Sequence, residues 1–243
     1  DRRTAVPACR LCDDFRQLDV TDAETLAKAV ADVGLLFPAL ENQNALAHLY
    51  AHAQQRGIPI VHDPEAYAVS ASKIASERFF RQTGIPIPGT YPECRFPVIA
   101  KPSVGSGSDS IQVFSTIDAL QQAIGPDPAN RAWIVQSFLP GPTYSVEVLR
   151  AGKSLQVLQV TDLYMDKGFD CKRVSAPSAL SSRVQNQLSD LALSMAKALY
   201  LQGIMDVEAV LHEGELNVLE IDARFPSQTP ITVFWSSGVN MVE

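Results

Sequence analysis

Residues 204–224 carry the sequence Ile-Met-Asp-Val-Glu-Ala-Val-Leu-His-Glu-Gly-Glu-Leu-Asn-Val-Leu-Glu-Ile-Asp-Ala-Arg. Apolar and polar residues alternate on both sides of a short segment centred on Gly214, a pattern typical of two antiparallel strands joined by a tight turn. Side chains two positions apart share one face of a strand. The stretch therefore predicts a β-hairpin with one acidic face and one apolar face.

The acidic face gathers four carboxylates if the turn covers an odd number of residues, 213–215: Asp206 then lies opposite Asp222, and Glu208 opposite Glu220. Like charges directly opposite destabilise a sheet, so such a patch needs a cation, and carboxylate oxygens suit Mg²⁺. The other face holds the side chains expected in the core, Met205, Val207, Leu219 and Ile221. An even turn that splits the acids between faces, or a solvated edge, is the alternative that the sequence leaves open.

A second feature is the segment 101–109, Lys-Pro-Ser-Val-Gly-Ser-Gly-Ser-Asp, between stretches that predict short strands at 98–101 and 111–114. Glycines let the backbone approach a ligand closely, and amides and hydroxyls can donate to phosphate oxygens. The lysine precedes the loop and a strand follows it, so this is not a Walker loop. A phosphate-binding loop and a solvated hairpin turn both remain open.

Three further features could complete a nucleotide site. The stretch 133–140, Trp-Ile-Val-Gln-Ser-Phe-Leu-Pro, predicts a strand ending in an aromatic residue and a proline, which could sandwich a flat base or simply belong to the core. Lys73 begins a helix predicted at 72–82 and could reach a phosphate, although it could equally be an ordinary surface lysine. Arg224 ends the acidic strand and, always charged, could stabilise a developing oxyanion.

The order of the remaining elements predicts two domains, at 1–68 and 69–243. In the first, Thr21 is expected to cap a helix with Glu24 as its capping-box partner. The pattern indicates a doubly wound α/β half-domain, truncated because a first strand and glycine turn are missing, with strands at 17–20, 33–37 and 58–62 and a helix at 42–55. The second domain is α+β, with helices at 117–124, 182–200 and after Gly238, strands at 132–136, 145–149 and 155–160, and an irregular polar segment at 162–177.

Composition excludes several classes of protein. With 46% hydrophobic and 19% charged residues, the 243-residue chain has the composition of a globular protein, and its net charge of −7 argues against a nucleic-acid binder. The longest apolar run, 33–40, is too short to cross a membrane. Four cysteines are too few for a disulfide scaffold. No signal-peptide pattern opens the chain, so a cytoplasmic protein is expected, with a homo-oligomer left open.

A lysine, a Gly/Ser loop between strands, an adenine-strap strand and a terminal Glu-x-Asn/Asp-x-Arg strand, in this order, resemble the ATP-grasp ligases; the last motif is Glu220-Ile-Asp-Ala-Arg224. The resemblance covers essentially the whole chain. The segments 203–209 and 220–230, followed by Trp-Ser-Ser-Gly at 235–238, are similar to the ligases of pyrrolysine biosynthesis, which join 3-methyl-D-ornithine to the ε-amine of L-lysine.

The resemblance implies an ATP-dependent carboxylate–amine ligase that uses ATP and Mg²⁺ and acts on small amino acids through an acyl phosphate. The nucleotide-binding residues would be Lys73, Lys101, Ser103, Gly105, Ser106, Gly107, Ser108, Gln136, Phe138 and Leu139. The metal ligands would be Glu208, Glu220 and Asp222. Arg224 and Lys101 would offset charge during phosphoryl transfer.

Four residues are candidates for binding substrate: Glu147 and Asp206 for an ammonium group, and Ser227 and Thr229 for a carboxylate. Two positions depart from the usual family pattern, since Asp222 stands where Asn is common and Gln136 where Glu is common. Two rival functions remain, another amino-acid or peptide ligase of this superfamily and a non-catalytic module that senses ATP.

Overall fold

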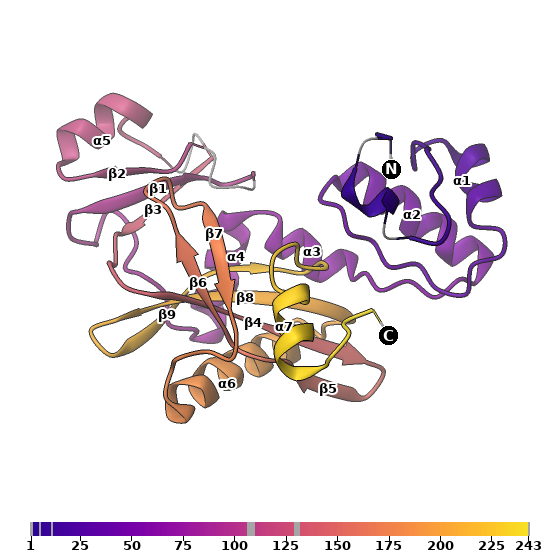
Figure 1. Cartoon of the computed structure of the whole chain (residues 1–243). Helices are drawn as coiled ribbons and strands as arrows, with labels where there is room; N and C mark the ends of the chain where they lie inside the picture. The colour runs from indigo at the N-terminus through magenta and orange to yellow at the C-terminus, as the bar shows by residue number, and fades with distance from the viewer. Residues whose placement is uncertain (1, 5, 11, 106–109, 129–131, 243) are drawn as a thin grey trace. The chain divides into compact units, whose positions relative to one another are not determined.

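The computed structural model describes residues 2–4, 6–10, 12–105, 110–128 and 132–242, and the chain divides into two compact units, Asp1–His62 and Asp63–Glu243 (Figure 1). The first unit contains a 3₁₀ helix, η1 (Pro7–Arg10), and the helices α1 (Ala23–Ala29) and α2 (Gln43–Arg56). Asn42 caps α2, and Gly57 ends it in the left-handed conformation. The helix predicted at 42–55 is thereby confirmed.

The other predictions for this unit need correction. The strands expected at 33–37 and 58–62 are replaced by a single parallel bridge between Leu36 and Ile60. The segment 17–20 forms no strand. Asp22, not Thr21, caps α1, because its carboxylate accepts hydrogen bonds from the backbone N–H groups of Glu24 and Thr25. A carboxylate at the N-cap also interacts favourably with the helix dipole.

The second unit begins with two helices and a three-stranded sheet. The helices are α3 (Pro64–Ser70) and α4 (Lys73–Thr83), and α4 is capped by Ser72 and ended by Gly84. The antiparallel sheet has the order β2–β1–β3, with β1 at Val98–Pro102, β2 at Gln112–Phe114 and β3 at Trp133–Ser137. Helix α5 (Ile117–Ile124) contacts β2, and its bounds are those predicted.

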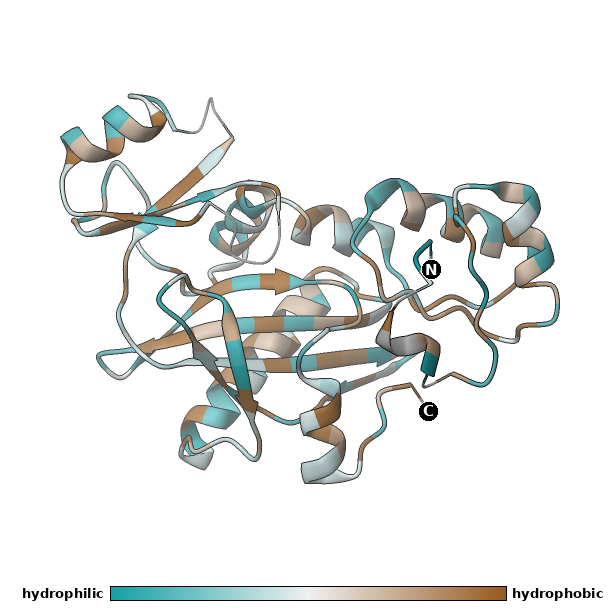
Figure 2. Cartoon of the chain, turned by 45° about the horizontal axis from the view of Figure 1, so that its top comes forward, coloured by the Kyte–Doolittle hydropathy of each residue, from teal (hydrophilic) through white to brown (hydrophobic). Residues whose placement is uncertain are grey.

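A larger antiparallel sheet, in the order β7–β6–β4–β8–β9 with β5 beside β4, forms the rest of this unit. The strands are β4 (Thr143–Ala151), β5 (Ser154–Val157), β6 (Thr161–Met165), β7 (Cys171–Ser175), β8 (Gly203–His212) and β9 (Glu215–Asp222). Helix α6 (Ser182–Ala198) packs against β4, β5 and β8. Figure 2 shows hydrophilic and hydrophobic bands alternating along the long strands, as expected for a sheet with two different faces.

Alternation separates a core face from a polar face in the larger sheet. The core-face side chains of β4 and β8 are fully buried and comprise Val146, Val148, Met205 and Val207. Glu147 and Asp206 lie between them on the opposite face, directly across from each other in the β4–β8 register. The mixed α/β architecture with antiparallel sheets confirms the predicted fold class.

Two predictions for the second unit are wrong. The segment expected to be irregular and polar, 162–177, contains β6 and β7, which pair as an antiparallel hairpin. The final helix precedes Gly238 and does not follow it: α7 spans Pro230–Ser237, and Gly238 ends it at φ 77°. A glycine at this position is typical of a helix end, because only glycine adopts that backbone angle without strain.

Candidate functional site

The hairpin of β8 and β9 pairs its acids as predicted, but the turn is not the one expected. Asp206 lies opposite Asp222, and Glu208 opposite Glu220. The turn has only two residues, Glu213 and Gly214, both with positive φ, and on its own would give a different pairing. A β-bulge after Glu208 shifts the register by one residue and brings the acids opposite one another.

The bulge also changes the role of Leu219. This residue was expected in the core, but it is only half-buried and lines a pocket beside Glu220. The other three side chains predicted for the apolar face are buried as expected, namely Met205, Val207 and Ile221. The bulge therefore turns one apolar side chain toward the ligand space while it keeps the acids aligned.

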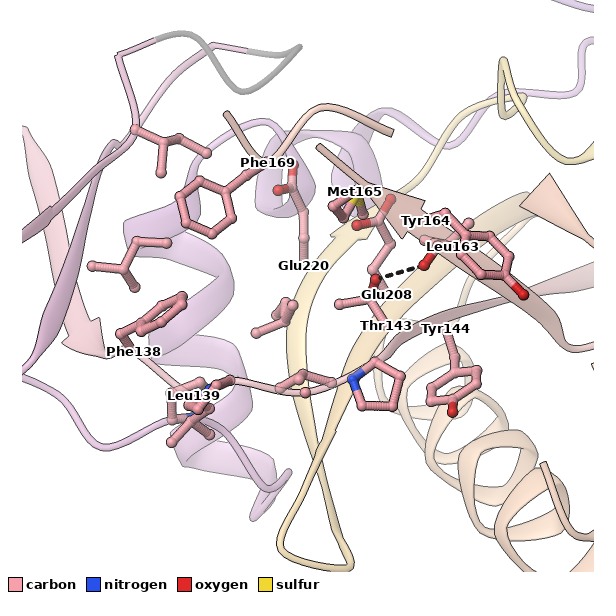
Figure 3. Close-up of a pocket in the computed structure, with 18 of the residues that line it drawn as sticks. Phe138, Leu139, Thr143, Tyr144, Leu163, Tyr164, Met165, Phe169, Glu208 and Glu220 are labelled. Atoms are coloured by element: carbon pink, nitrogen blue, oxygen red, sulfur yellow. Dashed lines mark hydrogen bonds between the residues drawn. The ribbon is translucent and has the colours of Figure 1, made fainter. Parts of the chain in front are cut away.

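The pocket has a volume of about 540 Å³ and lies between the two sheets of the second unit. Ile99 and Lys101 of β1 and Gln136 of β3 line it, followed by the segment from Ser137 to Thr143. Glu208 and Glu220 extend between the side formed by Phe138 and Leu139 and the side formed by β6 (Figure 3). A cavity of this size can enclose most of a small ligand such as a nucleotide.

The strap after β3 provides an apolar wall. Phe138 meets Phe169 of the β6–β7 hairpin edge to face, with ring centroids 5.8 Å apart. Gly141 lets the strap cross β8 closely, because a Cβ atom there would lie 2.2 Å from the carbonyl oxygen of Leu211. Gln136 is buried, with its polar amide in the wall of the pocket. A flat base could lie against these groups, with its hydrogen-bonding edge toward the amide.

Two lysines lie beside the acidic hairpin. The Nζ atom of Lys73 is 3.4 Å from Oε1 of Glu220 and donates a hydrogen bond of 3.0 Å to the carbonyl oxygen of Gly105. Lys101 is buried in the pocket wall. Burial lowers the pKa of Lys101, and the carboxylate of Glu220 opposes that change. Lys101 is therefore positioned to meet an anion that enters the pocket, and Lys73 lies next to the pocket-lining Glu220.

The acids themselves are strongly perturbed. Burial, together with Asp206 and Glu220, raises the pKa of Glu208 to about 8. Burial likewise raises the pKa of Asp206 to about 6, although the Ser145 hydroxyl donates a hydrogen bond to its carboxylate and opposes the rise. Groups of strongly shifted pKa in a pocket are typical of functional sites, because burial and like charge are both unfavourable without a ligand.

Arg224 pairs with one of the predicted metal ligands. Its Nη2 atom lies 2.7 Å from Oδ2 of Asp222, and its Nη1 donates to the carbonyl oxygen of Phe225 at 3.1 Å. In the part of the chain that is described, no three acidic, histidine or cysteine side chains form a ready-made metal site. Carboxylates such as those on β8 and β9 are oxygen ligands of the kind that Mg²⁺ prefers, and proteins often bind this ion through one or two carboxylates and the phosphates of a substrate.

Four of the remaining predicted residues do not line this pocket. Ser103 is buried against the start of α4, where its Oγ lies 3.0 Å from that of Ser72, and its side chain does not line the pocket. Ser227 is exposed, whereas Glu147 and Thr229 are buried. Ser106, Gly107 and Ser108 lie outside the described residues.

The contribution of β6 and the β6–β7 turn to the pocket differs from the irregular polar segment predicted there. Six pocket-lining residues come from this region: Asp162, Leu163, Tyr164, Met165, Asp166 and Phe169. Tyr164 also carries the guanidinium of Arg173, 3.7 Å above its ring. The signal that could have found them is the alternation in Thr161–Met165, where Thr and Tyr favour a strand.

A family model described as an ATP-grasp domain matches residues 70–228. The chain belongs to the ATP-grasp family. The resemblance found in the sequence is thereby confirmed, and so is the family named from it. The match covers every strand of the second unit, including the acidic hairpin and both lysines.

Individual relatives and solved structures agree with this family. The chain is 35% identical over 233 residues to the 3-methyl-D-ornithine--L-lysine ligase of Methanosarcina acetivorans and 32% identical over 232 residues to that of Methanosarcina barkeri. Each alignment covers 95% of this chain and 61% of the relative, so the chain spans about three fifths of their length. The biotin carboxylase domain of a Hydrogenobacter thermophilus 2-oxoglutarate carboxylase, solved with MgADP, has a TM-score of 0.80 at 17% identity, over 98% of this chain and 60% of that one.

The described helices include none that is both long and apolar enough to cross a membrane. Free cysteines among the described residues are Cys9, Cys12, Cys94 and Cys171.

Proposed function

We propose that this chain is the ATP-binding part of a carboxylate–amine ligase that joins 3-methyl-D-ornithine to the ε-amine of L-lysine in pyrrolysine biosynthesis. The observation that carries the proposal is the acidic β8–β9 hairpin with Lys73 and Lys101 beside it, where Lys101, Glu208 and Glu220 line a nucleotide-sized pocket. The substrates come from the names of the Methanosarcina relatives, which align with nearly the whole chain. A reaction that consumes ATP also favours the cytoplasm as its location.

The nucleotide would lie with its base between the strap and the β6–β7 hairpin. Gln136 could accept a hydrogen bond from the base, while Phe138, Leu139 and Phe169 enclose it. The phosphates would then extend toward Lys73 and Lys101 at the acidic hairpin. This orientation uses the apolar wall for the flat base and the cations for the charged end.

Glu208, Glu220 and Asp222 fit Mg²⁺ because they are oxygen ligands on one face of the hairpin. Once bound, the ion would neutralise phosphate charge. Lys73 and Arg224 now hold the carboxylates of Glu220 and Asp222. We expect both side chains to turn to the incoming anions, because a phosphate attracts them more strongly than an already neutralised carboxylate.

The proposed reaction has two steps. A carboxylate oxygen of the first substrate attacks the γ-phosphorus, the bond to ADP breaks, and an acyl phosphate forms. The amine of lysine then attacks the acyl carbon, loses a proton, and displaces inorganic phosphate to leave an amide. The residues of this chain contribute mainly position and charge: Lys101 holds the phosphates, and Arg224 stabilises charge that moves onto the transferring oxygens.

The test is to incubate the full-length protein with ATP, Mg²⁺, D-ornithine and L-lysine and to identify the product by mass spectrometry. The expected result is the amide of the two amino acids together with stoichiometric ADP and phosphate. An amide from other amino acids alone would indicate a different ligase of this family. ATP binding without ADP formation under any amino-acid condition would indicate a nucleotide-sensing module.

A further inference from the structure

Glu147 is a fully buried acidic side chain on β4 to which no described residue supplies a counter-charge. It lies on β4 with an exposed fraction of 0%. Both of its carboxylate oxygens, and the hydroxyl of buried Thr229, lack a hydrogen-bond partner among the described residues. Burying a carboxylate without a partner is among the most unfavourable arrangements in a protein. Such a group indicates that something else completes the site.

Protonation alone does not remove the problem. Burial, with Asp206 directly opposite, raises the pKa of Glu147 to about 8, so the side chain is neutral over much of the physiological range without a ligand. A neutral carboxyl group still carries a donor and an acceptor that require partners. The Thr229 hydroxyl lies close enough to lower the pKa of Glu147, but the geometry gives neither that hydroxyl nor the two carboxylate oxygens a hydrogen-bond partner among the described residues.

The other acids on this face differ because each has a cation nearby. Lys73 contacts Glu220 and Arg224 contacts Asp222, while the charges of Lys101 and Arg224 act on Glu208 and Asp206. No such contact reaches Glu147 within the described ranges; its charged neighbour is Asp206. A cation supplied by a ligand would therefore find two carboxylates and a hydroxyl here without competing with the lysines.

The side chains packed around Glu147 and Asp206 on this face are apolar. Helix α7 covers the face through Val233, which packs with Ile204 and Met241. Leu149, Leu158 and Phe225 extend the same cluster. Leu149 and Ile204 stand two residues from Glu147 and Asp206 on their strands, so they share the face with the acids. A ligand with an aliphatic stem and a charged end matches such walls.

We propose that Glu147, Asp206 and Thr229 form a subsite for a primary ammonium group, the one at the end of the side chain of the amino acid whose carboxylate is activated. The proposal rests on the proposed function, since it places the reacting carboxylate at the acidic hairpin. An ammonium group has three donors, and the three residues supply three acceptors. The Ser145 hydroxyl, which donates to Asp206, would hold that carboxylate in place.

Spacing on the sheet selects the side-chain ammonium over the α-ammonium. Glu147 lies directly opposite Asp206 in the β4–β8 register. Glu208, a proposed metal ligand, lies two residues further along β8 and is therefore a diagonal neighbour of Glu147. Diagonal neighbours on a sheet are about 7–8 Å apart. An α-ammonium, attached to the carbon next to the carboxylate, cannot span this separation, whereas a side-chain ammonium can. The site would thus select a diamino acid by the ammonium group at the end of its side chain.

The experiment compares two ligands that differ only in the terminal amine. D-Ornithine and D-norvaline are titrated into the full-length protein saturated with Mg²⁺ and a non-hydrolysable ATP analogue, with calorimetry as the readout. The unmodified protein should bind D-ornithine at least about tenfold more tightly than D-norvaline, the scale of one hydrogen bond to a charged group. This comparison needs no variant and so does not depend on how a substitution folds.

Variants then assign the difference to Glu147. In Glu147→Gln the preference for D-ornithine should fall by about tenfold or more, while affinity for the nucleotide analogue is unchanged. Glu215→Gln, at an exposed position at the start of β9, is the matched control and should change neither affinity.

The outcomes separate the two proposals. Equal binding of the two ligands, or a preference unchanged in Glu147→Gln, would overturn the ammonium subsite and leave the proposed nucleotide site intact. Loss of nucleotide binding by the unmodified protein would overturn the proposed function itself. A preference that requires Glu147, in a protein that binds the nucleotide, would support both.

Discussion

The carboxylates at the two ends of the acidic face in the larger sheet differ in whether a protein cation lies beside them. At the end formed by β8 and β9, protein cations hold the carboxylates, with Lys73 on Glu220 and Arg224 on Asp222. At the β4 end, Glu147 is enclosed beneath α7 without a cation among the described residues. At the β8–β9 end, a ligand could therefore replace the carboxylates as the partner of the protein cations. At the β4 end, only a ligand could supply the cation that Glu147 lacks among the described residues.

This difference separates two kinds of ligand. An anionic ligand such as a nucleoside triphosphate suits the β8–β9 end, which already contains lysine and arginine side chains, particularly when a divalent ion accompanies the ligand. A cationic ligand suits the end that contains only acids. A substrate with a carboxylate and a distant ammonium could contact both ends at once.

The largest expected effect is on turnover and concerns the β9 end. Arg224→Lys should lower kcat of the full-length enzyme by about a hundredfold or more, the usual scale for losing one oxyanion donor. Lysine keeps the charge but loses the planar fork that donates two hydrogen bonds at once. Affinity for ATP should change little, because Lys73 and Lys101 remain. Steady-state kinetics would measure kcat and the KM for ATP.

Arg183→Lys, at an exposed position on α6, is the matched control and should leave both constants unchanged. If Arg224→Lys also leaves turnover unchanged, Arg224 is a structural residue that only pairs with Asp222. If ATP binding is lost instead, Arg224 belongs to the nucleotide site and the division of roles between arginine and lysine is wrong.

The next effect is on stability and concerns the β4 end. Because the folded state raises the pKa of Glu147 from 4.5 to about 8, it binds more protons than the unfolded state between these values. The free energy of unfolding should therefore fall as the pH rises from about 5 to 8. Glu147→Gln should flatten this dependence and stabilise the ligand-free chain at pH 8. Thermal or urea unfolding at several pH values would show it.

Parallel curves for the two proteins would contradict this expectation, because they would mean that Glu147 titrates alike in the folded and unfolded states. Glu213→Gln, in the exposed β8–β9 turn, provides a control that should retain the full pH dependence. The same variant shows whether removing any single negative charge has a comparable effect.

The smallest expected effect concerns the apolar wall near the nucleotide. Phe169→Ala removes the ring that meets Phe138 edge to face, and an aromatic pair contributes about 1 kcal/mol beyond its buried area. Affinity for ATP should fall by roughly fivefold, with Mg²⁺ dependence retained. Fluorescence or calorimetric titration would measure it. An unchanged affinity would place the base away from the β6–β7 hairpin.

The sequence predicted the acidic hairpin because strand alternation reports directly which residues share a face. It also predicted the correct partners, but from an odd turn that does not exist. The observed turn is even, and the bulge after Glu208 compensates for it. A bulge depends on how neighbouring strands and ligands pack, so turn length alone could not reveal it.

Other parts of the fold could not be inferred in the same way. The β6–β7 hairpin differs from the predicted irregular segment because polar side chains occur in strands as well as loops, and here Asp162 and Tyr164 alternate with apolar residues. In the first unit, short apolar stretches predicted strands, but only Leu36 and Ile60 pair. The lack of a partner for Glu147 is a property of packing beneath α7, and no local pattern contains it.

The most direct test of the central claim is calorimetric titration of Mg·ATP into the chain and into Glu220→Ala, with Glu215→Ala as a control from the exposed start of the same strand. The unmodified chain and the control should bind Mg·ATP, and binding should weaken strongly when Mg²⁺ is removed. Glu220→Ala should lose this Mg²⁺-dependent binding, because it removes a carboxylate that we propose binds the metal and that pairs with Lys73. Equal Mg·ATP affinity in all three proteins would contradict the assignment of the acidic hairpin as the metal–nucleotide site.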